Sequence, residues 1–340
     1  MKIGFYNYHK SYNNNRMFTD CSSSIGDDLS YPFVYLAKHA KSKNIILSTI
    51  DTEPIGSYKT IFFIEYPTLK NKYFRQLINT STDLKLIIYE SEVIKQDNWN
   101  VNNHKYFSRI FTWNDTLVDN KKYLKTNFSC KVPTDLDFDI RKKTKLCTMI
   151  AGHKFKDHPL ELYTERVNVI RWFERYHPED FDLFGIGWDR YYYKGIFSRL
   201  NRIKMLPSLF YSKYPSYMGS VKSKREIMQK YKFAICYENA RDIIGYITEK
   251  IFDCFFAGCV PVYWGAPNVS DFIPKNTYID RNNFNSNEDM YNYLKYIPPK
   301  EYLDYLDAIK NFIQSDKIYP FSAECFAETI VNEILRKNHV

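Results

Sequence analysis

The sequence predicts an α/β protein in which two Rossmann-like domains face a central cleft. The chain has 340 residues, of which 44% are hydrophobic, so it is long enough for two domains with a core each. Short apolar runs typical of strands alternate with segments of helical periodicity, first in residues 1–91 and again in residues 145–267. This alternation favours parallel sheets that are covered by helices on both faces.

The first domain is expected to span residues 1–140. Its strand-like runs are KIGFYNY, NIILSTID, TIFFIEY and LKLIIYES, and its helix-like segments are SYPFVYLAKHAKSKN and LKNKYFRQLIN. The stretch from 129 to 145 is polar and charged and lacks sustained periodicity, so we interpret it as the linker between the domains.

The second domain is expected to span residues 141–340. Its strand-like runs are KLCTMIAG, FDLFGIGW, YKFAICYEN and CVPVYWGAP, and its helix-like segments are LELYTERVNVIRWFERY, KSKREIMQKY and ITEKIFDCFFAG. The C-terminal helix is expected to pack back on the first domain. Ligands of open parallel sheets bind outside the carboxyl ends of the strands, and residues 245–250 lie at such an end.

The net charge of +9 indicates an anionic partner. Candidates are a phosphorylated small molecule, an acidic membrane surface and a nucleic acid. No nucleic-acid partner is expected, because RNP-type motifs, zinc fingers and a basic low-complexity tail are absent from the sequence. No apolar run approaches the ~18 residues of a membrane span, and the N-terminus does not resemble a signal peptide, so we expect a cytoplasmic protein.

No metal site is expected. The seven cysteines form no C-x-x-C pair, which fits a reducing compartment, and the seven histidines are dispersed. The run TDLDFD at 134–139 contains D-x-D, a motif that binds Mn²⁺ together with a nucleotide sugar in some enzymes. Here it lies in the linker without a neighbouring strand, so we discount it and expect no cofactor.

The segment GYITEKIFDCFFAG suggests a site for an anion. Thr248 is a good N-cap and Gly258 suits the C′ position, which puts Glu249 and Lys250 in the first helical turn. The unpaired N–H groups and positive dipole end of a helix bind anions such as a pyrophosphate, and Lys250 adds a full charge. Glu249 could accept hydrogen bonds from sugar hydroxyls. From spacing alone, ordinary capping electrostatics on a solvated surface is the simpler explanation.

Residues 231–280 add a resemblance to a known family. YKFAICYEN, GYITEKIFDCFFAGCVPVYWGAP and DFIPKNTYID follow in the order and spacing of the C-terminal signature of glycosyltransferase family 10, the α-1,3/1,4-fucosyltransferases, of the bacterial or viral type. The resemblance implies a two-domain GT-B fold and metal-independent, inverting transfer. It also implies an acceptor-binding first domain with the general base, and a second domain that holds GDP-fucose.

The best-matched residues belong to the second domain. Tyr246, Glu249 and Lys250 match the family's Y-x-T-E-K motif, and the resemblance implies that they contact the nucleotide and its phosphates, together with Thr248 between them. Glu238 and Asn239 match the family's E-N pair, which lies near the donor sugar.

Other matches in the second domain are less direct. Arg190, after FGIGWD, is similar to an arginine that the family places against the pyrophosphate, although the spacing after it departs from the pattern. Arg166 resembles another family arginine, and a surface ion pair is the alternative explanation. Ala151 and Gly152 stand where many members have Ser-Asn.

The general base is expected in the first domain. Glu90 and Ser91 resemble the family's E-S-P, whose glutamate is the proposed base, and Glu92 replaces the proline. Two carboxylates therefore compete for the role, and we favour Glu90. We expect the like charge of Glu92 to raise the pKa of Glu90. A merely solvated glutamate is the alternative.

The implied reaction moves L-fucose from GDP-β-L-fucose to a hydroxyl of an N-acetyllactosamine-like glycan and forms an α-1,3 linkage. The alternatives are a transferase for another GDP-sugar and a sugar-nucleotide- or glycan-binding module without turnover. Residues 191–218 form a basic, aromatic insert that could contact an anionic membrane near a lipid-linked or lipopolysaccharide acceptor. We favour the simpler alternative, a surface loop over the donor cleft.

Overall fold

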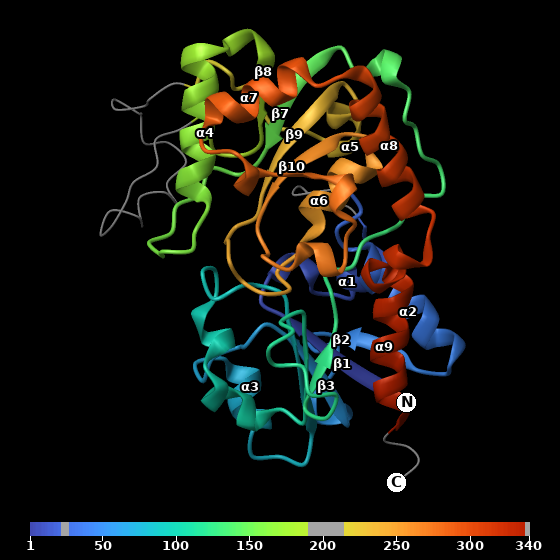
Figure 1. The fold of residues 1–340 in the computed structure, drawn as a ribbon. Helices are drawn as coiled ribbons and strands as arrows, with labels where there is room; N and C mark the ends of the chain where they lie inside the picture. The colour runs from blue at the N-terminus through green and yellow to red at the C-terminus, as the bar shows by residue number, and fades with distance from the viewer. Residues whose placement is uncertain (22–26, 190–213, 337–340) are drawn as a thin grey trace.

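The computed structural model describes residues 1–21, 27–189 and 214–336. In this part of the chain there are two parallel sheets, each with helices packed against it. The two α/β units lie one above the other in Figure 1. The predicted α/β architecture with two Rossmann-like units of the GT-B type is confirmed. The expected boundary at residues 140 and 141 falls between the last strand of the first sheet and the first strand of the second.

The first sheet has six parallel strands in the order β2-β1-β3-β4-β5-β6. The chain places β2 on one side of β1 and then crosses back to place β3 on the other side. The loops after β1 and β3 diverge at this reversal, which leaves a crevice for a ligand. The strands are β1 (Lys2–Asn7), β2 (Ile46–Thr49), β3 (Thr60–Ile64), β4 (Asp83–Ile88), β5 (Arg109–Thr112) and β6 (Tyr123–Lys125), and the helices are α1 (Arg16–Thr19), α2 (Tyr31–Ser42) and α3 (Lys72–Leu77).

The second sheet has five parallel strands in the order β11-β10-β9-β7-β8. Its reversal lies between β7 and β9, so a second crevice opens where these two strands end. The strands are β7 (Lys145–Ile150), β8 (Phe181–Phe184), β9 (Tyr231–Tyr237), β10 (Val260–Trp264) and β11 (Ile279–Asp280), and the helices are α4 (Tyr163–Tyr176), α5 (Lys224–Met228), α6 (Glu249–Phe256), α7 (Asn287–Tyr296), α8 (Pro299–Ile313) and α9 (Ala323–Arg336).

Helix α6 begins and ends at the predicted residues. Thr248 occupies the N-cap position and Gly258 follows the helix in the left-handed conformation, with φ 58°. The N–H of Cys259 donates to the carbonyl of Cys254 at 2.9 Å, which closes the last turn. Only glycine adopts this conformation without strain.

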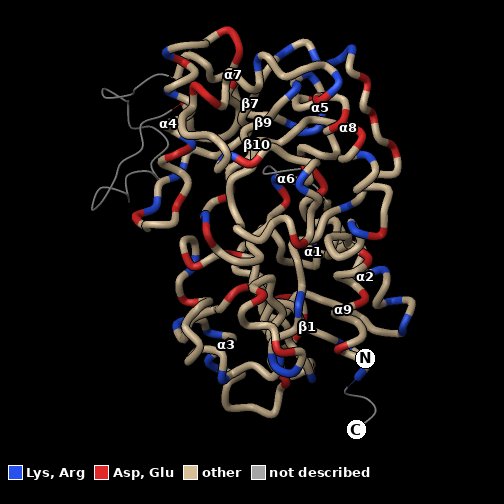
Figure 2. The backbone as a smooth tube through the Cα atoms, viewed as in Figure 1, with Lys and Arg blue, Asp and Glu red and all other residues tan. Residues whose placement is uncertain are grey.

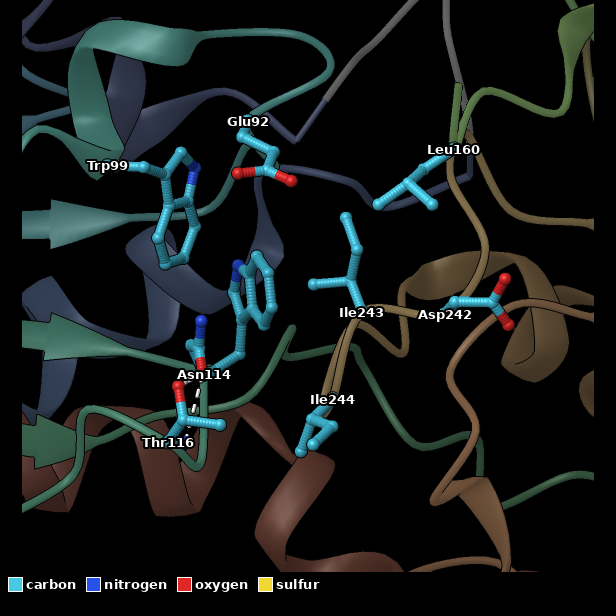
Figure 3. Close-up of a pocket in the computed structure, with 9 residues that line it drawn as sticks. Glu92, Trp99, Asn114, Thr116, Leu160, Asp242, Ile243 and Ile244 are labelled. Carbon is cyan, nitrogen blue, oxygen red and sulfur yellow. Dashed lines mark hydrogen bonds between the residues drawn. The ribbon is translucent and has the colours of Figure 1, made fainter. Parts of the chain in front are cut away.

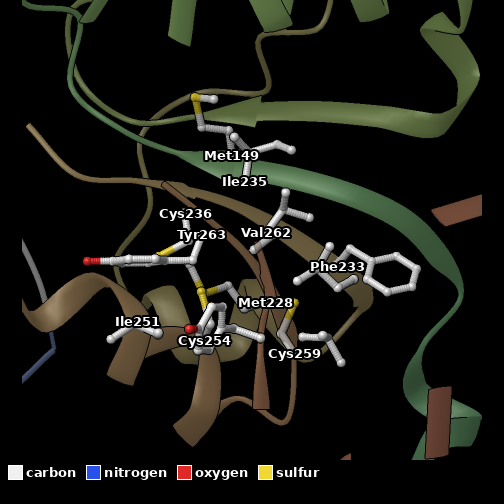
Figure 4. Close-up of a cluster of buried hydrophobic side chains, with 14 of the residues drawn as sticks. Met149, Met228, Phe233, Ile235, Cys236, Ile251, Cys254, Cys259, Val262 and Tyr263 are labelled. Atoms are coloured by element: carbon white, nitrogen blue, oxygen red, sulfur yellow. The ribbon is translucent and has the colours of Figure 1, made fainter. Parts of the chain in front are cut away.

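The core of the second domain lies between its sheet and the helices around it, α5 and α6 among them. Figure 4 shows side chains from β9, β10, α5 and α6 gathered there, and four cysteines of the chain are buried in this domain: Cys147, Cys236, Cys254 and Cys259. Each thiol packs as a small apolar group. Burial raises the pKa of Cys259 to about 12, so this thiol stays protonated.

The last helix joins the two domains. α9 follows α8 of the second domain but packs against α2, and its residues Phe326, Ile330 and Ile334 belong to the first-domain core (Figure 1). The buried carboxylate of Glu333 in α9 accepts from Lys85 of β4 at 2.7 Å. A second-domain segment therefore completes the core of the first domain.

Charged residues of both signs are interspersed along both domains in the view of Figure 2. In the part of the chain that the structure describes, no helix is both long and apolar enough to cross a membrane.

The left-handed glycine gives a stability prediction. An added Cβ at Gly258 would lie 2.8 Å from the ring of Phe138, so we expect Gly258→Ala to lower the free energy of unfolding by about 2 kcal/mol. Gly56→Ala is the matched control, because an added Cβ there meets nothing within 4 Å, and we expect a change within about 0.5 kcal/mol. Urea unfolding measures both variants, and equal stabilities would contradict the assigned role.

Candidate active site

A cleft of about 980 Å³ lies between the two sheets, at the carboxyl ends of their strands. On the first-domain side it is lined by the residues after β1, β3 and β4, including His9, Glu65 and Glu90. On the second-domain side it is lined by the residues after β7 and by the start of α6, including Lys154 and Lys250. Both topological reversals thus open into one cavity.

Glu238 anchors the start of α6. Its carboxylate is fully buried and accepts from the N–H of Thr248 at 2.8 Å, from the Thr248 hydroxyl at 2.6 Å and from Lys250 Nζ at 3.1 Å. Thr248 therefore occupies the N-cap position without a capping hydrogen bond from its side chain. Glu238 does not itself line the cleft, and its position near the donor sugar stays a prediction.

Lys250 and Glu249 form a network of alternating charges. Burial would lower the pKa of Lys250, but Glu238 and Glu249 outweigh burial and raise it above its usual range. Burial would raise the pKa of Glu249, but Lys250 and Lys224 outweigh burial and lower it to about 2. Both residues line the cleft and are charged at neutral pH, so the surface-capping alternative does not describe them.

Arg166 and Asn239 form the floor beside this network. Arg166 of α4 is buried and donates to the carbonyl of Tyr237 at 2.6 Å and to Asn239 Oδ1 at 3.1 Å. The alternative of a surface ion pair is therefore wrong for Arg166. Both residues line the cleft, together with Ala151 and Gly152 after β7.

Tyr246 joins the site to the first domain. Its ring is buried against Trp113, with 4.8 Å between centroids, and against Phe128, at 5.9 Å. Its hydroxyl lies 3.4 Å from Asn239 Nδ2. Burial raises the pKa of Tyr246 well above the usual value, so the hydroxyl remains protonated.

The two candidate bases occupy different pockets. Glu90 is half-buried in the large cleft, whereas Glu92 is exposed and lines a separate cavity of about 230 Å³ beside Trp99 (Figure 3). Burial raises the pKa of Glu90, and Lys250 and Lys154 across the cleft partly oppose this. The predicted direction is confirmed, but its cause is burial, because the charge of Glu92 does not contribute.

Lys154 is a cleft residue that sequence reasoning missed. It follows β7, it is exposed to the cleft, and desolvation there lowers its pKa while Glu90 opposes the shift. No carboxylate within ion-pair distance is found for it in residues 1–21, 27–189 and 214–336. Its position after a parallel strand was the available signal.

The remaining predicted features lie elsewhere. Asp137 and Asp139 of the D-x-D run pair with Lys142 and Arg141 at the surface, and among the described residues no group of His, Cys, Asp and Glu is arranged to hold a metal ion. Arg190, like residues 191–213 of the basic insert, lies outside the described residues.

The sequence model of glycosyltransferase family 10 (fucosyltransferase) C-term matches residues 198–325, a range that includes the start of α6. The match covers a little over a third of the chain, which is similar to the family's C-terminal domain over this range. The matched range ends within α9, the helix that packs against the first domain.

Two relatives that match part of the chain are also named as fucosyltransferases. Alpha-(1,3)-fucosyltransferase FucT of Helicobacter pylori is 40% identical over 90 residues, which are 26% of this chain and 18% of that protein. Alpha-(1,4)-fucosyltransferase of Arabidopsis thaliana is 39% identical over 80 residues, which are 23% and 20%. The matches therefore span a fifth or less of these relatives.

A solved structure extends the likeness of the fold to both domains. The crystal structure of an alpha1,3-fucosyltransferase with GDP aligns with 98% of this chain and 90% of its own, with a TM-score of 0.55 and 16% sequence identity. At this identity the likeness concerns the fold.

The buried anchor gives a second stability prediction. Glu238→Gln leaves the Lys250 ammonium without its buried counter-charge, so we expect the free energy of unfolding to fall by about 2–3 kcal/mol, less than for a fully buried pair because Lys250 is partly exposed. Glu226→Gln on the exposed face of α5 is the control, with an expected change within about 0.5 kcal/mol. If both variants unfold at the same denaturant concentration, Glu238 does not anchor α6.

Proposed function

We propose that the chain is an inverting fucosyltransferase, which moves L-fucose from GDP-β-L-fucose to a hydroxyl of an N-acetyllactosamine-like glycan in an α-1,3 linkage. One observation supports this most: the cation of the Y-x-T-E-K motif, in the range that the family 10 model matches, and a first-domain carboxylate with a raised pKa line the same interdomain cleft. These two residues are Lys250 and Glu90.

The second domain would bind the donor. The first-turn N–H groups of α6 have no partner inside the helix, and Lys250 keeps its charge at any physiological pH. Lys154 adds a cation without a carboxylate within ion-pair distance among the described residues. In this proposal the diphosphate rests against these groups, and they stabilise the charge that develops on it, an effect of about 2.7–4 kcal/mol for one well-oriented donor in other enzymes.

The first domain would supply the base. Glu90 takes the proton of the acceptor hydroxyl, and that oxygen attacks the anomeric carbon from the face opposite GDP. The bond from this carbon to the β-phosphate oxygen breaks, and GDP leaves with the electron pair. Attack and departure on opposite faces invert the configuration.

Three further parts of the proposal concern the surroundings of the reaction. The cations of the cleft take the role that a metal ion has in other glycosyltransferases, so no metal is required. The protein acts in the cytoplasm. Any peripheral contact with a membrane that carries the acceptor would use residues 191–218.

Release of GDP from a panel of GDP-sugars tests the function. We expect the purified chain to release GDP fastest from GDP-fucose, faster still with N-acetyllactosamine, and equally fast in excess EDTA. Lys250→Ala is the matched loss control, with an expected decrease of about 10²–10³-fold. Preference for another GDP-sugar would make the chain a different transferase, binding without release would make it a binding module, and loss of activity in EDTA would contradict metal independence.

The choice of base gives a separate prediction. We expect Glu90→Gln to lower kcat by about 10²–10⁴-fold and Glu92→Gln to leave it nearly unchanged, because Glu92 lies outside the large cleft. Since burial raises the pKa of Glu90, activity should be lost as the pH falls through a value above the usual ~4.3 for glutamate. Comparable losses in the two variants would show that the assignment to Glu90 is wrong.

A further inference from the structure

The backbone on both sides of the Glu90 Cα is held by a buried side-chain network. Oε1 of Glu65, just after β3, accepts from the N–H of Tyr89 and from the N–H of Glu90, each at 3.0 Å. On the other side, Nε1 of Trp99 donates to the carbonyl of Glu90 at 3.1 Å. Nε1 of Trp113 donates to the preceding carbonyl, that of Tyr89, at 2.7 Å. The peptides before and after Glu90 are therefore both fixed.

Asn98 fixes the second oxygen of Glu65. Oδ1 of Asn98 accepts from the N–H of Tyr66 at 2.8 Å, which turns Nδ2 of this buried amide toward Glu65 Oε2. Nε2 of His104 lies 2.7 Å from the carbonyl of Asn98 and holds that segment in turn. Both oxygens of Glu65 thus face donors, an arrangement that suits the ionised carboxylate.

This arrangement is unfavourable for a residue that serves stability alone. Glu65 is only 2% exposed, and within the described chain no lysine, arginine or histidine forms an ion pair with it. Its φ is 65°, a left-handed conformation that a glutamate rarely adopts. Burial, together with the charge of Glu90, raises the pKa of Glu65 to about 7. Strained backbone and buried unpaired charge concentrate at functional sites.

We propose that Glu65 is a positioning residue, whose carboxylate fixes the Tyr89–Glu90 peptide so that the Glu90 side chain is held in the cleft at the acceptor hydroxyl. Glu65 itself does not act as the base, because both its oxygens are turned to the backbone and to Asn98. This inference rests on the proposed function of Glu90. It adds that the rate depends on a residue that acts through Glu90.

Glu65→Gln tests the role. An amide keeps the size of the side chain but turns an NH₂ group either toward the two backbone N–H groups or toward the NH₂ of Asn98, so a donor meets a donor in both orientations. We expect kcat to fall at least tenfold, with KM for GDP-fucose and the Kd of GDP within twofold of wild type. A structural defect alone would not separate kcat from donor affinity in this way.

Glu333→Gln is the matched control, because Glu333 is an equally buried carboxylate packed in the first-domain core and does not line the cleft. We expect this variant to lose stability and to keep kcat per folded molecule. The proposal is overturned if Glu65→Gln keeps a kcat within twofold of wild type, if it loses GDP affinity in parallel, or if Glu333→Gln shows the same loss of kcat.

Hydrogen exchange separates this proposal from the proposed function. We expect the amides of residues 84–95 to exchange faster in Glu65→Gln than in wild type, while those of α6 are unchanged. If wild type turns over no GDP-sugar but this exchange difference is found, the proposed function fails and Glu65 still holds the segment. Unchanged exchange in residues 84–95 overturns the positioning role whatever the activity.

Discussion

The buried carboxylate of Glu238 holds together the second-domain side of the cleft. It lies just after β9 and requires several donors, because a buried charge without partners is strongly destabilising. Thr248 supplies two of them and Lys250 a third. Since the Thr248 hydroxyl donates to Glu238, it does not cap the first turn of α6. One buried side chain therefore aligns a strand, a helix and a cation.

The same principle operates on the opposite wall. Glu65 lies just after β3, and Glu238 lies just after β9. Each is a buried carboxylate that accepts a hydrogen bond from a backbone N–H of a later segment. In one case the segment begins α6, and in the other it carries Glu90. In both domains, a buried acid just after a parallel strand accepts a hydrogen bond from the backbone of a residue that lines the cleft.

Much of the fold is predictable from the sequence, because eight strands are apolar runs bounded by polar residues. The sequence does not predict β5, β6 and β11, since they have only four, three and two residues and β6 is half-exposed. The cleft residues of α6 are predictable from a local motif. The choice between Glu90 and Glu92 is not, because the turn after β4 decides which neighbour faces the cleft. Glu65 and Lys154 each follow a predicted strand, but the sequence does not predict that both come close to Glu90, which is distant from Lys154 along the chain.

Because α9 completes the core of the first domain, residues 1–140 are not a complete folding unit. The first-domain core includes Phe326, Ile330 and Ile334, which are more than 180 residues from the domain boundary in sequence. A fragment cut at residue 140 would expose the apolar surface of α2 that α9 covers, so it would lack part of its own interior. The chain also crosses between the domains twice, once at the linker and once before α9. Because the chain connects the domains at two places and α9 packs against α2, the two domains are not held together by a single linker.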